Sequence, residues 1–585
     1  MEECKMKTAK KLLSLVLALA VLFSLAVPTM AAEGDVVIYY TNDVHTYMNN
    51  EEGWKYSTLA SLKKADANAI LVDAGDHAQG TAYGGMDKGV TISKLMEAAG
   101  YDVSTLGNHE FDYGMERCLE MTKETSVPYV CCNFHHVKDG VDGDKVLDSF
   151  KIIEKAGKKV AFVGILTPQT FTSSTPAYFQ DGNGNYIYGI CGGTDGKELY
   201  DCVQKAVDEA KAAGADYVIA LGHVGDDPAT APWTSELVVA NTTGIDAFID
   251  GHSHSTVPSQ IVKDKSGKEV VITQTGSYLE SIGKLTITAD GKFSAELLDA
   301  TVAATYTPDA AVKAIEDAWI ADVDGKLGTK IGFSEVTFDN YEGETRLVRR
   351  QETNTGDLAA DALYYMFDNM DMDVDVAIMN GGGVRNKTIT GDITYKTCKE
   401  IHTFGNVACL QTITGQQLLD ALEWGASKLS ADGSTENGGF LHISGAKYTI
   451  DLSIPSTVQA DDKGVWTGGP TGAYRVSNVQ IKNNETGAWE PLKLDAKYNL
   501  AGYNYTLRDL GDGFAMFAGA VNVLDYVAED YMVLANYVQS FPAKNGVPTI
   551  TNASGYADLY GNGRITILNS TYAKPSYMPN TGAIA

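Results

Sequence analysis

Short apolar runs rich in β-branched and aromatic residues recur through the first half of the chain. They lie at 36–40, 69–72, 103–106, 217–221 and 247–249. Continuous apolar runs of this length are typical of strands that are buried on both faces. Between them, residues 92–99 and 199–213 carry apolar side chains at helical spacing. Strands that alternate with helices predict a layered α/β core.

Polar residues that can bind metal follow these predicted strands. They are Asp43, His45, Asp76, Asn108, His109, His223, His252 and His254. Five of the ten histidines in the chain belong to this set. In open α/β sheets the binding site forms outside the carboxyl ends of the strands, so we expect these side chains to converge. A purely structural role for all of them is hard to reconcile with that repeated placement.

The donor types indicate a class of chemistry. Mixed imidazole and carboxylate ligands suit Zn²⁺, Mn²⁺ or iron better than Ca²⁺ alone. This set has more donors than one tetrahedral ion can use, and a carboxylate such as Asp76 can bridge two ions that lie about 3.5–4 Å apart. Two such ions lower the pKa of a shared water and stabilise an in-line displacement at phosphorus. The pattern therefore predicts phosphoester hydrolysis with two divalent metal ions.

Five blocks carry a family resemblance in the first half. Asp43-x-His45, Gly75-Asp76, Gly107-Asn108-His109-Glu110, Gly222-His223 and Gly251-His252-x-His254 resemble the calcineurin-like metallophosphoesterases. The stretch from Asn108 to Gly114 resembles the secreted 5′-nucleotidase and UDP-sugar hydrolase family. This resemblance implies a four-layer β-sandwich flanked by helices.

The same resemblance implies roles for the individual residues. Asp43, His45, Asp76 and His254 would surround one metal, and Asp76, Asn108, His223 and His252 would surround the other. A hydroxide that bridges the two metals would attack the phosphorus in line. His109 would stabilise the transition state or protonate the leaving oxygen, and Asp112 would hold it. His254 occupies a position at which several relatives have an amide.

From about residue 340 the sequence motifs differ from those of the first half. A buried strand is predicted at 374–379, and Asn380-Gly381-Gly382-Gly383-Val384-Arg385 follows it without the G-x-G-x-x-G spacing of a dinucleotide site. This block, 403–406 and 504–514 resemble the 5′-nucleotidase C-terminal domain, which implies a second α/β domain that recognises nucleotides. The substrate-binding residues that the resemblance implies are Arg349, Asn380, Arg385, Phe404, Tyr505 and Asp512.

Each of these residues has an implied task. Phe404 and Tyr505 would sandwich the base, and Asp512 would bind the ribose hydroxyls. Arg385 and one upstream arginine, for which Arg349 is the best candidate, would meet phosphate or ribose. Tyr505 stands where the family usually has phenylalanine, so the base preference stays open.

The chain divides into segments by composition. Four lysines, an apolar run at 12–27 and small residues predict a signal peptide at 1–31, and hence a secreted or cell-surface protein. We expect a metallophosphoesterase domain at 32–306, a linking helix and hinge at 307–340, a substrate-recognition domain at 341–570 and a flexible tail at 571–585. No other stretch is long and apolar enough to cross a bilayer.

Charge and cysteine content narrow the functions further. The net charge of −29 argues against binding to nucleic acid, although metal ions and a few arginines can still attract a nucleotide substrate. We expect His77, His135 and His136 to be surface or loop groups. An odd number of cysteines remains after the signal segment, with Cys191–Cys202 a candidate bridge. The oligomeric state stays open.

Other functions remain to be separated from nucleoside monophosphate hydrolysis. The same fold could act on 2′,3′-cyclic nucleotides, as a phosphodiesterase or 3′-nucleotidase, or on UDP-sugars. A surface adhesin would bind nucleotides without releasing phosphate. A panel of substrates distinguishes these alternatives.

Overall fold

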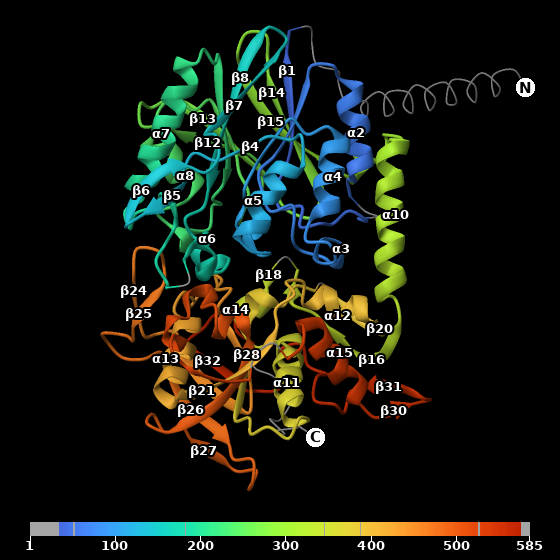
Figure 1. Cartoon of the computed structure of the whole chain (residues 1–585), viewed down its shortest axis with the longest axis vertical. Helices are drawn as coiled ribbons and strands as arrows, with labels where there is room; N and C mark the ends of the chain where they lie inside the picture. Colours follow the sequence, from blue (N-terminus) through green and yellow to red (C-terminus); the bar gives the residue numbers. More distant parts are fainter. Residues whose placement is uncertain are drawn as a thin grey trace, which may run out of the picture.

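The protein has two lobes, one above the other in Figure 1. The computed structural model describes residues 34–50, 53–181, 183–343, 345–386, 388–524 and 527–574. The predicted signal peptide lies outside these ranges. Within them, no helix combines the length and the apolar character that a membrane crossing needs.

The N-terminal lobe contains two six-stranded sheets. The first has the order β15-β14-β1-β2-β3-β4, and the second has the order β12-β13-β11-β10-β8-β7. The strands of the first are Phe293–Asp299, Ser281–Ile287, Val36–Thr41, Ala69–Asp73, Val103–Thr105 and Tyr129–Val130. Those of the second are Thr256–Lys263, Glu269–Thr275, Ala247–Ile249, Tyr217–His223, Lys158–Leu166 and Phe150–Lys155. Strands β1–β4 of the first sheet are parallel to one another. In the second sheet the parallel strands are β8, β10, β11 and β13.

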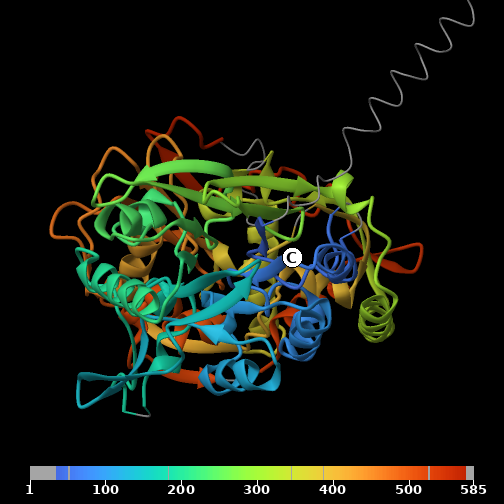
Figure 2. The same cartoon turned by 90° about the horizontal axis from the view of Figure 1, so that it is seen from above.

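The two sheets face each other, and helices cover their outer faces (Figure 2). Alternate residues of β1 divide between the two sides: Ile38 packs against the second sheet, and Tyr39 packs against helices. The helices on that side include α2 (Tyr56–Ala65) and α4 (Val90–Ala99), and α7 (Lys197–Ala212) covers the other side. The predicted four-layer α/β sandwich is therefore confirmed.

Several predicted elements differ from the observed ones at their ends. The strand expected at 103–106 ends at Thr105, because the chain turns into the 3-10 helix η1 (Asn108–Phe111). A short strand that the apolar pattern did not predict, β9 (Tyr188–Ile190), pairs with β5 (Phe134–Lys138). The last strand of the domain that is expected to reach residue 306 ends at Asp299, and the short helix α9 (Ala300–Ala303) follows it.

Helix α10 (Ala310–Leu327) runs along one side of the molecule from the upper lobe to the lower one (Figure 1). The carboxylate of Asp309 accepts hydrogen bonds from the N–H groups of Ala311 at 3.0 Å and Val312 at 3.2 Å, which caps the helix. Its buried Val312 and Val323 pack on the N-terminal lobe. A helix is thus observed within 307–340, the segment in which a linking helix is expected.

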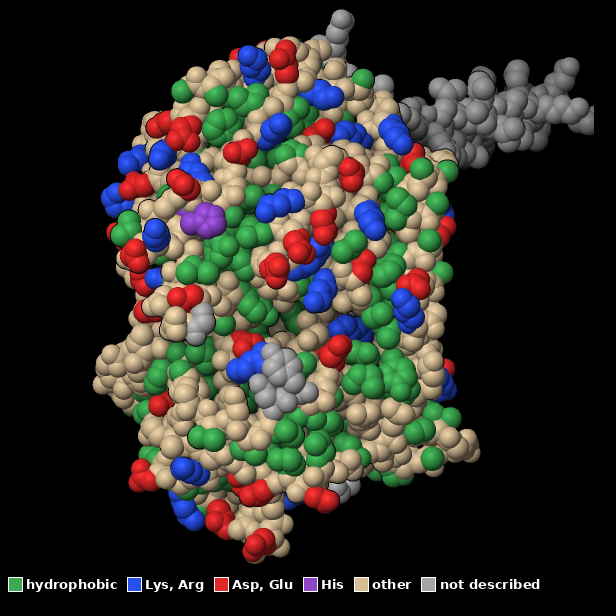
Figure 3. Space-filling model, viewed as in Figure 1, with side chains coloured by type: hydrophobic (Ala, Val, Ile, Leu, Met, Phe, Trp, Pro, Cys, Tyr) green, Lys and Arg blue, Asp and Glu red, His purple; other side chains and the backbone are tan. Residues whose placement is uncertain are grey.

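The C-terminal lobe is a second α/β unit. Its five-stranded sheet has the order β22-β19-β28-β21-β29, with strands Leu441–Ser444, Val376–Asn380, Lys497–Tyr503, Ala408–Thr414 and Val521–Leu524. Helices α11 (Asn354–Asp368) and α15 (Asp530–Ser540) pack on one face, and α13 (Gly415–Ala426) packs on the other. The surface in Figure 3 carries acidic and basic side chains side by side, without a broad patch of one sign.

Candidate active site

The residues predicted to bind metal lie at the carboxyl ends of the parallel strands. Asp43 follows β1, Asp76 follows β2, and His223 ends β10. Asn108 and His109 begin η1 after β3, while His252 and His254 follow β11. Because the parallel strands of both sheets end at the edge that faces the C-terminal lobe, residues from five strands meet there.

The backbone at these positions is strained. Asp43, His45, Asp76, His252 and His254 have positive φ angles of 48°, 47°, 59°, 81° and 59°. Positive φ is uncommon outside glycine and costs about 1–3 kcal/mol per residue. Such strain collects at functional sites, where the surrounding structure holds side chains in a required geometry.

Gly107 owes its place to close packing and not to an unusual turn. Its φ of −100° is open to any residue. A Cβ atom at Gly107 would lie 2.2 Å from Oδ1 of Asp76, however. Any side chain there would displace the carboxylate, so only glycine lets η1 approach the strand end that carries Asp76.

The first donor group consists of Asp43, His45 and His254. Nε2 of His45 lies 3.0 Å from Nε2 of His254, and the latter lies 3.4 Å from Oδ1 of Asp43. The Oδ2 atom of Asp76, a residue of the second donor group described below, lies 3.8 Å from Nε2 of His45.

The second donor group consists of Asp76, His223 and His252. Nε2 of His223 lies 3.1 Å from Oδ2 of Asp76. The side-chain oxygen of Asn108 lies 2.8 Å from Nδ1 of His252. Asp76 therefore stands between the two groups, which is the position that a bridging carboxylate requires.

Backbone carbonyls fix the orientation of two imidazoles. Nδ1–H of His45 donates to the carbonyl of Gln79 at 2.9 Å, and Nδ1–H of His223 donates to that of Ala74 at 2.7 Å. Both Nε2 atoms are thereby turned toward the carboxylates. Nε2 of His223 is buried and makes no hydrogen bond among the described residues, although Oδ2 of Asp76 lies 3.1 Å away. A ring that is fixed through one nitrogen and points the other at a carboxylate is the usual arrangement of a metal ligand, so these residues fit bound cations.

Burial sets the protonation of the site. It lowers the pKa of His252 to about 3, helped by His223, and it holds the pKa values of His45 and His254 well below the usual range. These rings are neutral, as metal ligation requires. Burial opposes ionisation of Asp76 too, but the neighbouring imidazoles of His223 and His109 outweigh it and hold the pKa of Asp76 low.

His109 and Asp112 form a close pair beside the donor groups. Nδ1 of His109 lies 2.5 Å from Oδ2 of Asp112, and the backbone N–H of His109 donates to Oδ1 of Asp76 at 2.8 Å. Burial lowers the pKa of His109, but the carboxylates of Asp112 and Asp76 outweigh it and raise that pKa above its ordinary value. A protonated imidazole can therefore face the cleft, where it can give a proton to a leaving oxygen.

The prediction that His77, His135 and His136 are surface or loop groups holds in part: His77 lies on a loop but is buried, His135 is buried in β5, and His136 is exposed. Nδ1–H of His77 donates to Asp73 at 2.8 Å, and Nε2 lies 2.8 Å from the hydroxyl of Tyr129. The alternation pattern could not reveal this, because His77 lies past the strand end, on the loop that carries Asp76.

Glu110 is a site residue that the sequence reasoning did not single out. Its carboxylate accepts hydrogen bonds from the N–H groups of Gly107 at 2.6 Å, Asp76 at 2.9 Å, His77 at 2.9 Å and Ala78 at 3.1 Å. It thereby fastens the loop of Asp76 to η1. The only sequence signal was its place next to His109.

The nucleoside-pocket residues come from three segments of the C-terminal lobe. Asn380 ends β19, and its Nδ2 donates to Oδ2 of Asp512 at 2.9 Å. The N–H of Asp512 donates to the hydroxyl of Tyr505 at 3.1 Å. Phe404 lies with its ring centroid 5.7 Å from that of His109 and 5.7 Å from Cζ of Arg385.

The arginines of the 346–350 segment differ in their partners. Nε of Arg346 and Nη2 of Arg350 each lie 2.8 Å from a carboxylate oxygen of Glu436. Arg349 has no such ion pair within the described part of the chain. Burial, together with Arg346 and Arg385, lowers the pKa of Arg349 to about 10. Its guanidinium is thus the one in this segment that is available to an anion.

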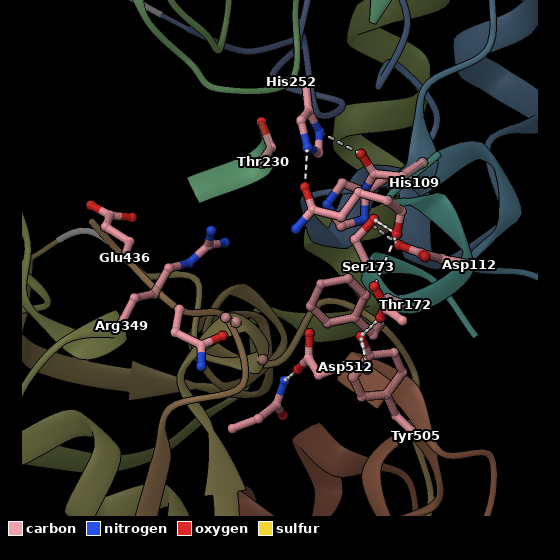
Figure 4. A pocket seen from close by; sticks show the side chains of 18 of the residues that line it. His109, Asp112, Thr172, Ser173, Thr230, His252, Arg349, Glu436, Tyr505 and Asp512 are labelled. Carbon is pink, nitrogen blue, oxygen red and sulfur yellow. Dashed lines mark hydrogen bonds and ion pairs between the residues drawn. The ribbon is translucent and has the colours of Figure 1, made fainter. Parts of the chain in front are cut away.

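A single cleft joins these parts, and Figure 4 shows it from close by. The N-terminal lobe contributes His109, Asp112 and His252, and the C-terminal lobe contributes Arg349 and Asp512. Asp43, His45 and His223 are fully buried behind this lining. The structure therefore brings all the predicted site residues together. Gln169, Thr172 and Lys428 also line the cleft and were not predicted.

Comparisons with known proteins agree with this geometry. Residues 36–256 match the model of the calcineurin-like phosphoesterases, and residues 330–519 match that of the 5′-nucleotidase C-terminal domain. The 5′-nucleotidase of Homo sapiens is 24% identical over 88% of this chain and 91% of its own length. That of Rattus norvegicus is 25% identical over 93% of this chain and 95% of its own length.

A solved structure gives the same answer. The crystal structure of a 5′-nucleotidase precursor from Thermus thermophilus superposes with a TM-score of 0.72 at 25% identity, over 92% of this chain and 100% of that chain. The two lobes thus correspond, in order along the chain, to the two matched domain models. The chain belongs to the 5′-nucleotidase family, whose members join a calcineurin-like phosphoesterase domain to a 5′-nucleotidase C-terminal domain, and it is a hydrolase.

Proposed function

We propose that this chain is a secreted, metal-dependent phosphoesterase that hydrolyses nucleoside 5′-monophosphates to nucleoside and phosphate. One observation carries the proposal: two neighbouring cation-donor groups open into the same cleft as an aromatic and carboxylate pocket, and Asp76 of the second group lies 3.8 Å from His45 of the first. The donor groups suit the phosphate of a nucleotide, and the aromatic and carboxylate pocket suits its nucleoside.

Two divalent ions, Zn²⁺ or Mn²⁺, suit the donor set. Asp43, His45 and His254 would hold one, and Asn108, His223 and His252 would hold the other, with Asp76 shared. Bound there, the ions would supply an activated water and would neutralise charge on the phosphoryl oxygens. The strained backbone and the carbonyl-anchored imidazoles keep the donors in place before any ion arrives.

The remaining residues act on the substrate directly. Arg349 and Arg385 would meet the phosphate, since both guanidinium groups reach the cleft. His109 would protonate the departing ribose oxygen, because Asp112 and Asp76 favour its charged form. That proton converts a poor alkoxide leaving group into an alcohol.

The nucleoside end is defined by shape and by hydrogen bonds. The rings of Phe404 and Tyr505 offer flat faces to a base. Oδ2 of Asp512 is already held by Asn380, which leaves the other carboxylate oxygen to accept from the ribose hydroxyls. A stacked base is tolerated whatever its identity, so we expect activity on several nucleoside monophosphates.

We also propose how the chain is divided and where it acts. Residues 32–306 would form the metal domain and 341–570 the recognition domain, with the helix at 307–340 as a link whose hinge brings substrate to the metals. The predicted signal at 1–31 supports secretion. A relative that is 24% identical over 91% of this chain is named snake venom 5′-nucleotidase, from Crotalus adamanteus.

A substrate panel tests this function. Purified protein is analysed for bound metal and assayed for phosphate release from AMP, 2′,3′-cyclic AMP, UDP-glucose and 4-nitrophenyl phosphate. We expect kcat/KM to be highest for AMP. A preference for the cyclic nucleotide or for UDP-glucose would replace the proposed substrate. Nucleotide binding without any phosphate release would favour a surface binding protein.

A further inference from the structure

The turn Gln169–Ser174, which contains helix α6 (Thr170–Ser173), lies where the two lobes meet. We call these six residues the α6 turn. It is closed by its own backbone, because the carbonyl of Gln169 accepts the N–H groups of Thr172 and Ser173, both at 2.9 Å. The hydroxyl of Thr170 donates to the carbonyl of Thr167 at 2.7 Å and fixes the entry to the turn. These hydrogen bonds make the turn compact, so a contact at one end of the turn can change the position of residues at its other end.

The first residue of the α6 turn contacts a metal donor. Oε1 of Gln169 lies 2.9 Å from Nε2 of His252. The other ring nitrogen of His252, Nδ1, faces the side-chain oxygen of Asn108 at 2.8 Å. With Nε2–H donated to Gln169, the lone pair of the ring is directed into the donor group. Gln169 thereby sets both the tautomer and the orientation of this imidazole.

The last residue of the turn contacts the His109 pair. The hydroxyl of Ser174, which is fully buried, donates to Oδ1 of Asp112 at 3.2 Å. The second carboxylate oxygen, Oδ2, receives Nδ1–H of His109. Ser174 thus keeps the plane of the Asp112 carboxylate turned toward the imidazole.

The middle of the turn contacts the opposite lobe. The hydroxyl of Tyr505 donates to the carbonyl of Thr172 at 3.0 Å, and it accepts the N–H of Asp512 at 3.1 Å (Figure 4). Phenylalanine, the residue that the family usually has here, could make neither bond. The ammonium group of Lys463, also from the C-terminal lobe, lies 5.9 Å from the ring centroid of Phe171. The turn is therefore a docking point for the nucleoside pocket.

We propose that the α6 turn is a positioning element that couples the nucleoside pocket to the catalytic centre, with the hydroxyl of Tyr505 as its fastening. When the lobes close, Tyr505 holds the turn through Thr172. The turn then holds His252 through Gln169 and Asp112 through Ser174. Tyr505 accordingly has a second task besides stacking on a base. This inference rests on the proposed function for its choice of substrate and for the metal that the donor groups would hold.

The central experiment removes one oxygen atom. Tyr505→Phe keeps the ring but loses both hydroxyl contacts, and a lost hydrogen bond lowers kcat/KM by about 2- to 12-fold. We expect similar decreases for AMP and for 4-nitrophenyl phosphate, because the turn supports the centre that both substrates use. Tyr364→Phe is the matched control: it removes a hydroxyl that donates to Asn484 at 2.8 Å, outside the cleft, and should leave both values unchanged.

A second measurement does not depend on turnover. Gln169→Met keeps the length of the side chain but removes the acceptor for His252, while Gln169→Glu keeps an acceptor. We expect Gln169→Met to lower metal affinity by about 10- to 100-fold, measured by elemental analysis after dialysis against graded chelator, with Gln169→Glu close to the parent. The double variant Gln169→Met with Tyr505→Phe should lower kcat/KM by a smaller factor than the product of the two single decreases.

Several outcomes would overturn the inference. Unchanged kinetics of Tyr505→Phe on both substrates would leave the tyrosine as a stacking residue only. A loss confined to AMP would mean that the hydroxyl touches the nucleoside. If the decrease in kcat/KM of the double variant equals the product of the two single decreases, Gln169 and Tyr505 act independently and the turn does not couple them. If the parent enzyme cleaves only the aryl phosphate, the proposed substrate is wrong. The kinetics on 4-nitrophenyl phosphate and the metal affinity then still test whether the α6 turn positions the catalytic centre.

Discussion

The replacement Phe404→Ala separates nucleoside recognition from catalysis. The ring of Phe404 reaches the cleft from the loop after α12 (Tyr395–Ile401), beside His109 and Arg385. A base stacked on an aromatic side chain contributes about 1–3 kcal/mol, which corresponds to an increase of about 5- to 160-fold in KM for AMP. A small aryl phosphate that does not reach this ring should change far less. The assay is the ratio of kcat/KM for AMP to that for 4-nitrophenyl phosphate.

The control for this variant is Phe333→Ala. Phe333 is a half-buried ring on β16 (Lys330–Phe338), with the ammonium group of Lys330 5.4 Å from its centroid, and it does not line the cleft. It should leave the ratio unchanged. If Phe404→Ala lowers kcat/KM equally for both substrates, the ring supports His109 or Arg385 and the stacking assignment is wrong.

Three further predictions concern the catalytic centre. His109→Ala should lower kcat by about 10²–10⁴-fold while bound metal, measured by elemental analysis, stays near the parent level; parallel loss of metal would make His109 a ligand. Asp112→Asn removes the negative charge that favours the His109 imidazolium, so the pKa of His109 falls and the alkaline limb of the kcat/KM profile should move to lower pH; an unmoved limb would exclude His109 as the acid. Asp76→Ala should lose both activity and metal, whereas a variant that retains both ions would show that the carboxylate is not shared.

Much of the N-terminal lobe followed from pattern alone. Runs such as 217–221 are buried on both faces, and this burial is what makes them apolar throughout. The convergence of Asp43, Asp76 and His223 was predictable because parallel strands carry their following residues to one edge. A helix was also predicted within 307–340, where α10 lies.

The remainder depended on contacts that leave no periodic signal. Glu110 and His77 act through hydrogen bonds to loop backbone and to Asp73, and loops have no fixed spacing. Gln169 meets His252 across 83 residues of sequence. Glu436 engages Arg346 and Arg350, which supports the proposal that Arg349 meets the substrate, and no periodic pattern distinguishes these three arginines.

The most direct test of the account is an anomalous difference map from crystals grown with Zn²⁺ or Mn²⁺. We predict two peaks about 3.5–4 Å apart, on either side of the Asp76 carboxylate. One should touch His45 and His254, and the other should touch His223 and His252. A single peak, or peaks away from these side chains, would contradict the two-metal hydrolysis that the account proposes.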